Sequence, residues 1–274
     1  MAQKPVMTPF LAELEPAVEE NYRRHFDTAE PWYAHDFVPY DRGQNFQFLG
    51  GSDWDPSQVT LPKHITDALE ILLITKDNLS AVHREFVEHF ILENWWCDWI
   101  GRWTAEEHHH AIVLRQYLVV TREIDPVANE HVRVQHVMNG YRADTLSKIE
   151  TLVVMALRAR EQAVFCRRLA AEIDDPTLSR LMDFIAVDEE RHTVFFENLV
   201  RECHRLEPEE TVAAIAARAA ELDVVGADIA PYKDKVAAVA EAGIFDENLM
   251  RQAISDAIAA WGLSDRQELA QFVR

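Results

Sequence analysis

The sequence contains Glu107-His108-His109-His110 and, further along, Glu189-Glu190-Arg191-His192, each inside a long run of helix-forming residues. Residues three positions apart lie on one face of a helix, so each Glu-x-x-His pair can offer a carboxylate and an imidazole to one metal ion. Two such pairs, joined by one Glu from each of two further helices, form the ligand set of di-iron carboxylate bundles. The two stretches therefore predict a helical bundle with a buried metal site.

Apolar residues around each pair indicate which side of its helix faces the core. The second pair continues a stripe with three-and-four spacing that also contains Leu178, Met182, Ile185 and Phe196. The first stretch allows two pairings, Glu106 with His109 or Glu107 with His110. The stripe through Glu107 and His110 is otherwise apolar, and it consists of Trp96, Ile100, Trp103, Leu114 and Leu118. The other stripe includes Arg102 and Gln116. We therefore expect Glu107 and His110 to face inward, and the residues facing solvent to be Glu106, His108 and His109.

Length and composition agree with one all-α domain. The 274-residue chain has only 8 Gly, and its long stretches rich in Ala, Leu, Glu and Arg lack the alternating Val, Ile and Thr of strands. Its 48% hydrophobic residues can bury a core large enough to hold polar ligands. We predict a single domain over residues 1–274, with an N-terminal helix and irregular strap at 1–60, a core bundle at 61–205 and packing helices at 206–274.

Periodicity and helix breakers divide the chain further. A first helix at about 9–26 precedes the strap, which holds turn formers such as Pro31, Pro39 and Gly50-Gly51. The expected core helices cover about 61–90, 93–121, 144–172 and 177–205. Shorter helices are expected at about 127–139, 209–222, 229–242 and 246–261.

Composition also excludes several classes of protein. A formal charge of −20 disfavours nucleic acid as a partner, because phosphate binding needs a basic face. No apolar run approaches the roughly 20 residues that span a bilayer, and the first residues open no signal-peptide core. Three unclustered cysteines, Cys97, Cys166 and Cys203, are typical of reduced thiols. We therefore expect a cytoplasmic protein without a transmembrane segment.

A di-metal site also needs a carboxylate from each core helix that lacks a Glu-x-x-His pair. In the helix at 144–172, Glu161 shares a stripe with apolar residues, and Glu150 lies on the same face as an alternative. In the helix at 61–90, the corresponding window covers residues 74–82. That window contains no Glu, and Asp77 is its only carboxylate.

These segments resemble those of the soluble acyl-[acyl-carrier-protein] desaturases, in particular their actinobacterial branch. Residues 103–110 resemble the family's W-T-A-E-E-N-R-H, and residues 188–192 resemble its D-E-K-R-H. Residues 160–163 stand where the family has Q-E-R-A, and residues 32–37 resemble W-Q-P-x-D-F. The similarity runs from about residue 8 to the C-terminus.

The resemblance implies a ferritin-like four-helix bundle core with additional N- and C-terminal helices, assembled as a homodimer. It implies an enzyme that inserts a cis double bond into a fatty acyl chain on acyl carrier protein, using iron, dioxygen and electrons from ferredoxin. Carried over position by position, the implied iron ligands are Glu107, His110, Glu161, Glu189 and His192. Trp32 and Asp188 are implied to form a path with His110, although ordinary packing of Trp32 is the alternative.

Two positions depart from the family pattern. Lys76 stands where the family has the remaining ligand Glu, and Val164 stands where it typically has a Thr that helps to deliver protons. Four carboxylates balance two Fe(II), whereas three carboxylates and an ammonium leave the site positively charged, which burial strongly disfavours. Asp77 could take the place of the missing Glu, one metal could be lost or weakly held, or Lys76 could swing out so that water completes the shell. We favour the second or third outcome.

These departures leave more than one class of function open. The leading interpretation is a desaturase whose metal chemistry is altered or impaired, and the alternative is a catalytically silent metal- or acyl-binding paralogue. Another ferritin-like oxidase fits less well. Iron storage does not account for the long C-terminal helices, and a ribonucleotide reductase subunit needs a radical-forming Tyr near a ligand. No Tyr follows Glu107 until Tyr117.

Overall fold

The chain folds into helices. The computed structural model describes residues 7–90, 93–140 and 146–273, and every regular element within them is an α-helix or a 3₁₀ turn. The α-helices are α1 (Pro9–Thr28), α2 (Lys63–Asp77), α3 (Leu79–His89), α4 (Asn94–Val120), α5 (Pro126–Gly140), α6 (Lys148–Glu172), α7 (Pro176–Leu206), α8 (Pro208–Glu221), α9 (Lys233–Glu241) and α10 (Glu247–Ala260). The predicted all-α fold class is therefore confirmed. Among the described residues, none of these helices combines the length and apolar character needed to cross a membrane.

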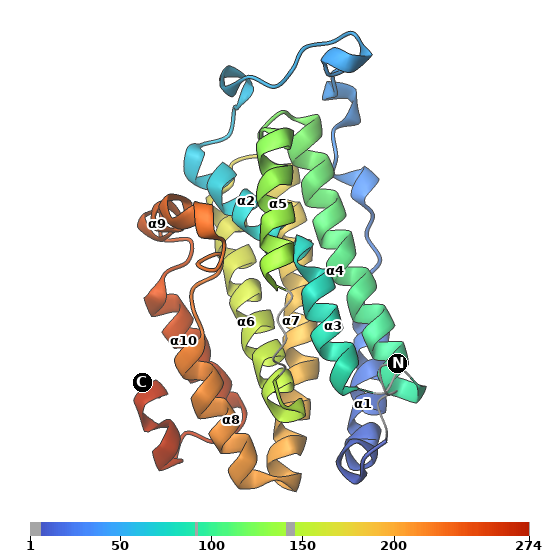
Figure 1. Ribbon diagram of the computed structural model, residues 1–274, viewed down its shortest axis with the longest axis vertical. Coiled ribbons are helices and arrows are strands. Elements are labelled where there is room, and N and C mark those ends of the chain that lie inside the picture. Colours follow the sequence, from blue (N-terminus) through green and yellow to red (C-terminus); the bar gives the residue numbers. More distant parts are fainter. Residues whose placement is uncertain (1–6, 91–92, 141–145, 274) are drawn as a thin grey trace.

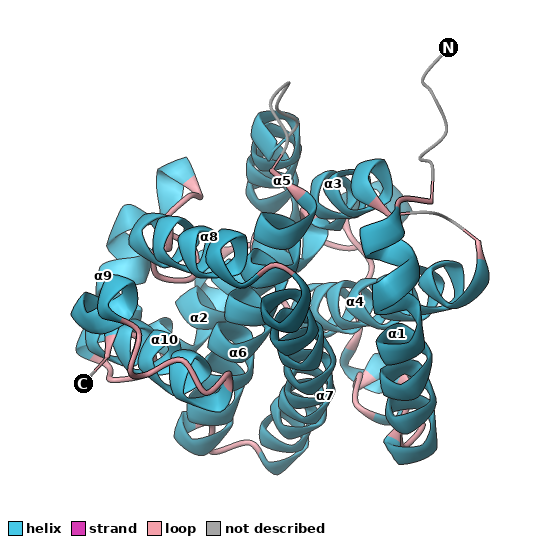
Figure 2. Cartoon of the chain, turned by 90° about the horizontal axis from the view of Figure 1, so that it is seen from below, coloured by secondary structure: helices cyan, strands magenta, loops and turns pink. Residues whose placement is uncertain are grey.

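The centre of the molecule is a ferritin-like bundle built from α2 with α3, α4, α6 and α7 (Figure 1). α6 and α7 pack against each other along their length. α1 lies against α4 and α7 on one side, whereas α8 and α10 cover α6 on the other side (Figure 2). The additional helices therefore enclose the bundle, and the side chains at its centre are shielded from water.

Local capping determines where the two longest core helices of the second half begin. The Ser147 hydroxyl accepts a hydrogen bond from the Glu150 amide, and the Glu150 carboxylate accepts one from the Ser147 amide, which forms a capping box at the start of α6. Asp175 caps α7 in a similar way. Glu150 is thus used at the helix end, which leaves Glu161 as the inward carboxylate of α6. The start predicted near Asp144 lies outside the described residues.

The segment at 61–90, predicted as one helix, is two helices. Asn78 separates α2 from α3. Its backbone N–H donates to the carbonyl of Thr75, three residues earlier, over 3.3 Å instead of continuing the α-helical hydrogen-bond pattern. Asn is a weaker helix former than Leu or Lys, and its side chain forms no capping hydrogen bond at this break. The break follows Lys76 by two residues, so Lys76 lies in the last turn of α2 at the bundle centre.

Two residues just after the end of α4 hold the irregular strap that was predicted before the core. The Arg122 guanidinium stacks 3.9 Å from the centre of the Phe46 ring and donates to the carbonyls of Gln44, Asn45 and Ser52. The Glu123 carboxylate accepts from the amides of Thr60 and Leu61. The bonds from Arg122 satisfy carbonyls of the strap, and those to Glu123 satisfy backbone amides at its end. Together they fix the position of the chain that leads into α2.

A glycine allows the chain after α8 to approach α2 closely. Gly226 has φ of +87°, and a Cβ at this position would lie 2.6 Å from Cγ2 of Ile71. Both the backbone conformation and the short distance require glycine. This segment borders the cavity beside the polar cluster at the bundle centre.

We expect Gly226→Ala to lower the free energy of unfolding by about 2–4 kcal/mol, because it adds overpacking to the cost of a left-handed residue. Gly262→Ala is the matched control, since Gly262 has φ of +74° but no atom within 4 Å of the added Cβ. Urea denaturation of both variants separates the two costs. Equal destabilisation would show that the approach to Ile71 contributes nothing.

Candidate metal centre

The helices α4 and α7 bring the two Glu-x-x-His pairs together. Glu107 and His110 from α4 face Glu189 and His192 from α7, and all four side chains are buried. His192 Nδ1 lies 3.2 Å from Glu107 Oε1, and His110 Nδ1 lies 3.4 Å from Glu189 Oε1. Each imidazole thus meets the carboxylate of the other helix, and the register predicted from the apolar stripes is the one observed.

Lys76 occupies the middle of this cluster. Its ammonium group donates to Glu107 Oε2 over 2.8 Å and forms a second ion pair with Glu189. Burial alone would lower the pKa of Lys76, but the two adjacent carboxylates raise it above its ordinary value. Burial would raise the pKa of Glu189, and Lys76 holds it well below its ordinary value. The cluster therefore carries an ammonium with two carboxylates.

Neither Asp77 nor an outward Lys76 replaces the missing family Glu in this structure. Asp77 forms an ion pair with Arg115 instead of turning toward the centre. The Lys76 side chain points inward and is 1% exposed. Its position follows from the helix register, because a residue at the ligand position of α2 faces the carboxylates of α4 and α7.

Glu161 reaches the core from α6. Its side chain is fully buried, and Oε2 accepts a hydrogen bond from Arg158 Nη1 over 2.8 Å. Oε1 has no hydrogen-bond partner among the described residues. Burial raises the pKa of Glu161 to about 7 despite the neighbouring Arg158. Val164, one turn further along α6, is half-buried against the core.

Asp188 connects His110 to the N-terminal strap. Its Oδ2 lies 3.2 Å from His110 Nε2 and accepts a hydrogen bond from Trp32 Nε1 over 2.9 Å. Trp32 also stacks on His109, with ring centres 4.2 Å apart. The residues named for this path by the resemblance are therefore in direct contact, and Trp32 is both packed and hydrogen-bonded.

Two of the three residues expected to face solvent do not. Glu106 is largely buried and pairs with His192 Nε2 over 2.9 Å and with His25 Nε2 over 2.9 Å. His109 is half-buried under Trp32, and only His108 is exposed. The prediction used only the apolar face of α4, so it missed the contacts that α1 makes with Glu106 and the strap makes with His109. One signal was available: Glu106 precedes Glu107 as Asp188 precedes Glu189.

A cavity of about 190 Å³ adjoins the cluster. It begins at Lys76, Glu107 and Glu189, and its other lining residues include the apolar Val82, Val154, Met155 and Phe196. Arg158 and Asp228 also line a second hollow of about 610 Å³. The cluster therefore borders a partly apolar cavity.

Several donor atoms of the cluster fit a metal ion. Within the cluster, His110 Nδ1 and His192 Nδ1 are buried and lack a hydrogen-bond partner in the described part of the chain, although buried polar atoms are normally paired. Glu107, His110 and Glu189 can bring ligand atoms within 4.8 Å of one another. The charges favour few cations: Lys76 already offsets one of the two carboxylates that it contacts, so each further divalent ion adds positive charge to the buried cluster.

In this helical bundle, carboxylates and imidazoles from separate helices converge at the centre. This arrangement is typical of ferritin-like proteins, and its side chains could hold a metal ion. The chain matches the family model of fatty acid desaturases over residues 7–274 and belongs to that family. It is 64% identical to a provisionally named acyl-[acyl-carrier-protein] desaturase DesA2 of Mycobacterium tuberculosis, over 100% of this chain and 99% of the relative. The expected actinobacterial branch is thereby confirmed.

Other similar proteins also carry names of acyl-[acyl-carrier-protein] desaturases. DesA1 of the same organism, also provisionally named an acyl-[acyl-carrier-protein] desaturase, is 30% identical over 98% of this chain and 82% of its own length. The chloroplastic stearoyl-[acyl-carrier-protein] 9-desaturase 6 of Arabidopsis thaliana is 31% identical over 45% of this chain and 33% of its own. The X-ray structure of the M. tuberculosis DesA2 superposes with a TM-score of 0.86 and 56% identity, covering 97% of this chain and 100% of that chain.

The raised pKa of Glu161 makes stability depend on pH. The folded protein holds the Glu161 proton up to a pH of about 7, whereas the unfolded chain releases it near its ordinary pKa of 4.5. The contribution of Glu161 to stability therefore falls as pH rises through this window. We expect Glu161→Gln to gain stability relative to the natural chain between pH 5 and pH 8, by up to about 3 kcal/mol.

Urea denaturation of the metal-free proteins at both pH values measures this shift. Glu210→Gln provides the baseline, because Glu210 is exposed. A stability difference for Glu161→Gln that does not change with pH would contradict the prediction.

Proposed function

We propose that this protein is an acyl-[acyl-carrier-protein] desaturase-type oxidoreductase, which binds a fatty acyl chain on acyl carrier protein and introduces a cis double bond. The observation that carries the proposal is the convergence of Glu107, His110, Glu189 and His192 beside a partly apolar cavity. The names of the relatives support the substrate class, because they are called acyl-[acyl-carrier-protein] desaturases.

Iron is the proposed cofactor. Carboxylates and imidazoles suit Fe(II), and iron with dioxygen supplies an oxidant strong enough to break an unactivated C–H bond. The residues that would hold the metal are Glu107, His110, Glu189 and His192, with Glu161 of α6 as a further carboxylate ligand. The bundle contributes position and exclusion of water, and the apolar lining of the cavity suits an acyl chain.

Lys76 limits how much iron the site can hold. It lies on the side of His110, where the family has its remaining Glu, and it takes up one oxygen each of the Glu107 and Glu189 carboxylates. The other oxygens of these carboxylates, Glu107 Oε1 and Glu189 Oε2, face His192. We infer that the natural chain holds one metal ion on the His192 side more strongly than a second one on the His110 side.

The same observation supports a second candidate, a catalytically silent paralogue that binds acyl-acyl carrier protein. An ammonium that satisfies two carboxylates lets the centre fold without any metal. In this case the cavity would still take an acyl chain, but no oxidation would follow.

The remaining features of the proposal come from the family. A ferredoxin-type donor would supply electrons, the protein would act as a homodimer, and it would work in the cytoplasm. The contacts of Asp188 with Trp32 and His110 support the proposal that these residues form an electron path toward the centre.

We expect the natural chain to bind fewer than two iron atoms per subunit, and Lys76→Glu to raise this number toward two. The substitution restores the fourth carboxylate, which balances two Fe(II) ions. Anaerobic loading with Fe(II) followed by elemental analysis measures the stoichiometry. Lys233→Glu is the control, since it makes the same charge change at an exposed position. Two tightly held irons in the natural chain would refute the role given to Lys76.

Turnover distinguishes the two candidate functions. Each protein is supplied with reduced ferredoxin, dioxygen and saturated acyl-acyl carrier protein, and the acyl chains are analysed by mass spectrometry. We expect a monounsaturated product, formed faster by Lys76→Glu than by the natural chain. Binding of acyl-acyl carrier protein without product from either protein would favour the silent paralogue. Failure to bind it would refute both.

A further inference from the structure

The two Glu-x-x-His helices support each other's histidines. On each helix, the acidic residue directly before the pair crosses to the histidine of the other helix. Asp188 of α7 lies 3.2 Å from His110 Nε2 on α4, and Glu106 of α4 lies 2.9 Å from His192 Nε2 on α7. The arrangement is reciprocal, although sequence reasoning identified only the Asp188 half of it.

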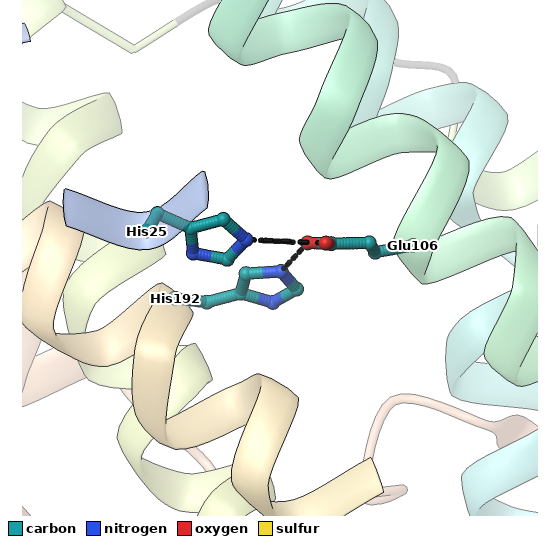
Figure 3. A group of neighbouring side chains, drawn as sticks. All are labelled: His25, Glu106 and His192. Carbon is teal, nitrogen blue, oxygen red and sulfur yellow. Dashed lines mark hydrogen bonds and ion pairs between the residues drawn. The ribbon is translucent and has the colours of Figure 1, made fainter. Parts of the chain in front are cut away.

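Each of these carboxylates is in turn held by a ring from the N-terminal part of the chain. Trp32 donates to Asp188, and His25 of α1 contacts both oxygens of Glu106, at 2.9 and 3.1 Å. Figure 3 shows the two imidazoles of His25 and His192 meeting Glu106 from the same side. Their rings are nearly parallel, with centres 5.6 Å apart.

Packing fixes the outer ring as well. His25 is 3% exposed, and its imidazole meets the indole of Trp99 edge-on with centres 5.2 Å apart. Arg102, one turn before Glu106, forms an ion pair with the same carboxylate. Glu106 therefore has little freedom to leave His192.

We propose that Glu106 and His25 are positioning residues that hold His192 with Nε2 bonded outward and Nδ1 directed into the cluster. This inference rests on the proposed function, in which His192 Nδ1 is a metal ligand. A ligating imidazole is commonly oriented through its second nitrogen, which fixes the tautomer and the direction of the ring. The contacts of His192 follow this pattern, since Nε2 is bonded to Glu106 while Nδ1 faces Glu107 and Glu189.

The presence of Lys76 makes this support asymmetric. Lys76 and His110 share Glu189 Oε1, whereas His192 faces Glu107 Oε1 and Glu189 Oε2, which Lys76 does not occupy. Loss of Glu106 should therefore weaken metal binding by the natural chain more than loss of Asp188. In Lys76→Glu, where both sides have their carboxylates, the two losses should become similar.

The three side chains His25, Glu106 and His192 are close enough to bind a metal ion themselves. The positioning role is favoured because both imidazoles are already bonded to Glu106 and the Arg102 guanidinium adds positive charge beside this carboxylate. A metal at this trio is one outcome that the experiment can detect.

The first test is a titration with Co²⁺, whose visible absorption reports its ligands. Glu106→Ala should weaken Co²⁺ binding by about 10–100-fold, the usual effect of losing such a supporting residue. Asp188→Ala should have a smaller effect in the natural background. His25→Phe should also weaken binding, and His25→Gln should restore part of it because its amide can donate to Glu106. Glu190→Gln should leave binding unchanged, since Glu190 is exposed.

The second test observes His192 in the metal-free protein by ¹⁵N NMR of the imidazoles. The Nε2 proton of His192 should be protected from exchange in the natural chain and in Glu190→Gln, and it should lose this protection in Glu106→Ala. A purely structural role of Glu106 would lower stability without this change. An unchanged ring signal, together with unchanged Co²⁺ affinity, would overturn the proposal.

One further variant separates this proposal from the proposed function. If His192→Ala leaves Co²⁺ binding unchanged, His192 is not a ligand and the proposed metal centre fails. If His192→Ala weakens binding but Glu106→Ala does not, only the positioning role fails. If His25→Phe removes a bound Co²⁺ while His110→Ala and Glu161→Ala do not, the trio itself is the metal site and the positioning role is wrong.

Discussion

The buried contact between the Lys76 ammonium and the carboxylates of Glu107 and Glu189 determines what the rest of this bundle can do. Charges at this depth are tolerated only when they are paired, and removing one partner of such a pair typically costs about 3–5 kcal/mol. The helices α2, α4 and α7 must therefore stay in the register that keeps these groups together. A metal ion that enters the cluster has to compete with an ammonium for the same oxygens.

The bundle positions these groups through contacts between distant segments. The helices α4 and α7 each provide a histidine and the acidic residue that orients the histidine of the other helix. The outer partners, Trp32 and His25, come from the strap and from α1. The N-terminal segment is thus more than a cover for the core, because it fixes the carboxylates behind both imidazoles.

Much of this arrangement could be predicted from the sequence. Helix periodicity was sufficient for α4, α6 and α7 and for the inward direction of Glu107 and Glu161, because those properties depend on residues within one helix. The role of Glu106 could not be obtained in that way, since its partners lie on α1 and α7. The break at Asn78 was also missed, because the apolar pattern continues across it. The inward direction of Lys76 depends on carboxylates contributed by two other helices.

Lys76 acts as a built-in counter-ion for the carboxylates of Glu107 and Glu189. In a site with four carboxylates and no metal, like charges would crowd together in the core, and folding would depend on metal binding. In this chain the ammonium neutralises part of that charge before any metal arrives. We therefore expect the fold to depend less on metal and the same ion pairs to weaken the attraction for a second cation. Lys76 is for this reason expected to stabilise the metal-free bundle and, at the same time, to disfavour binding of a second iron.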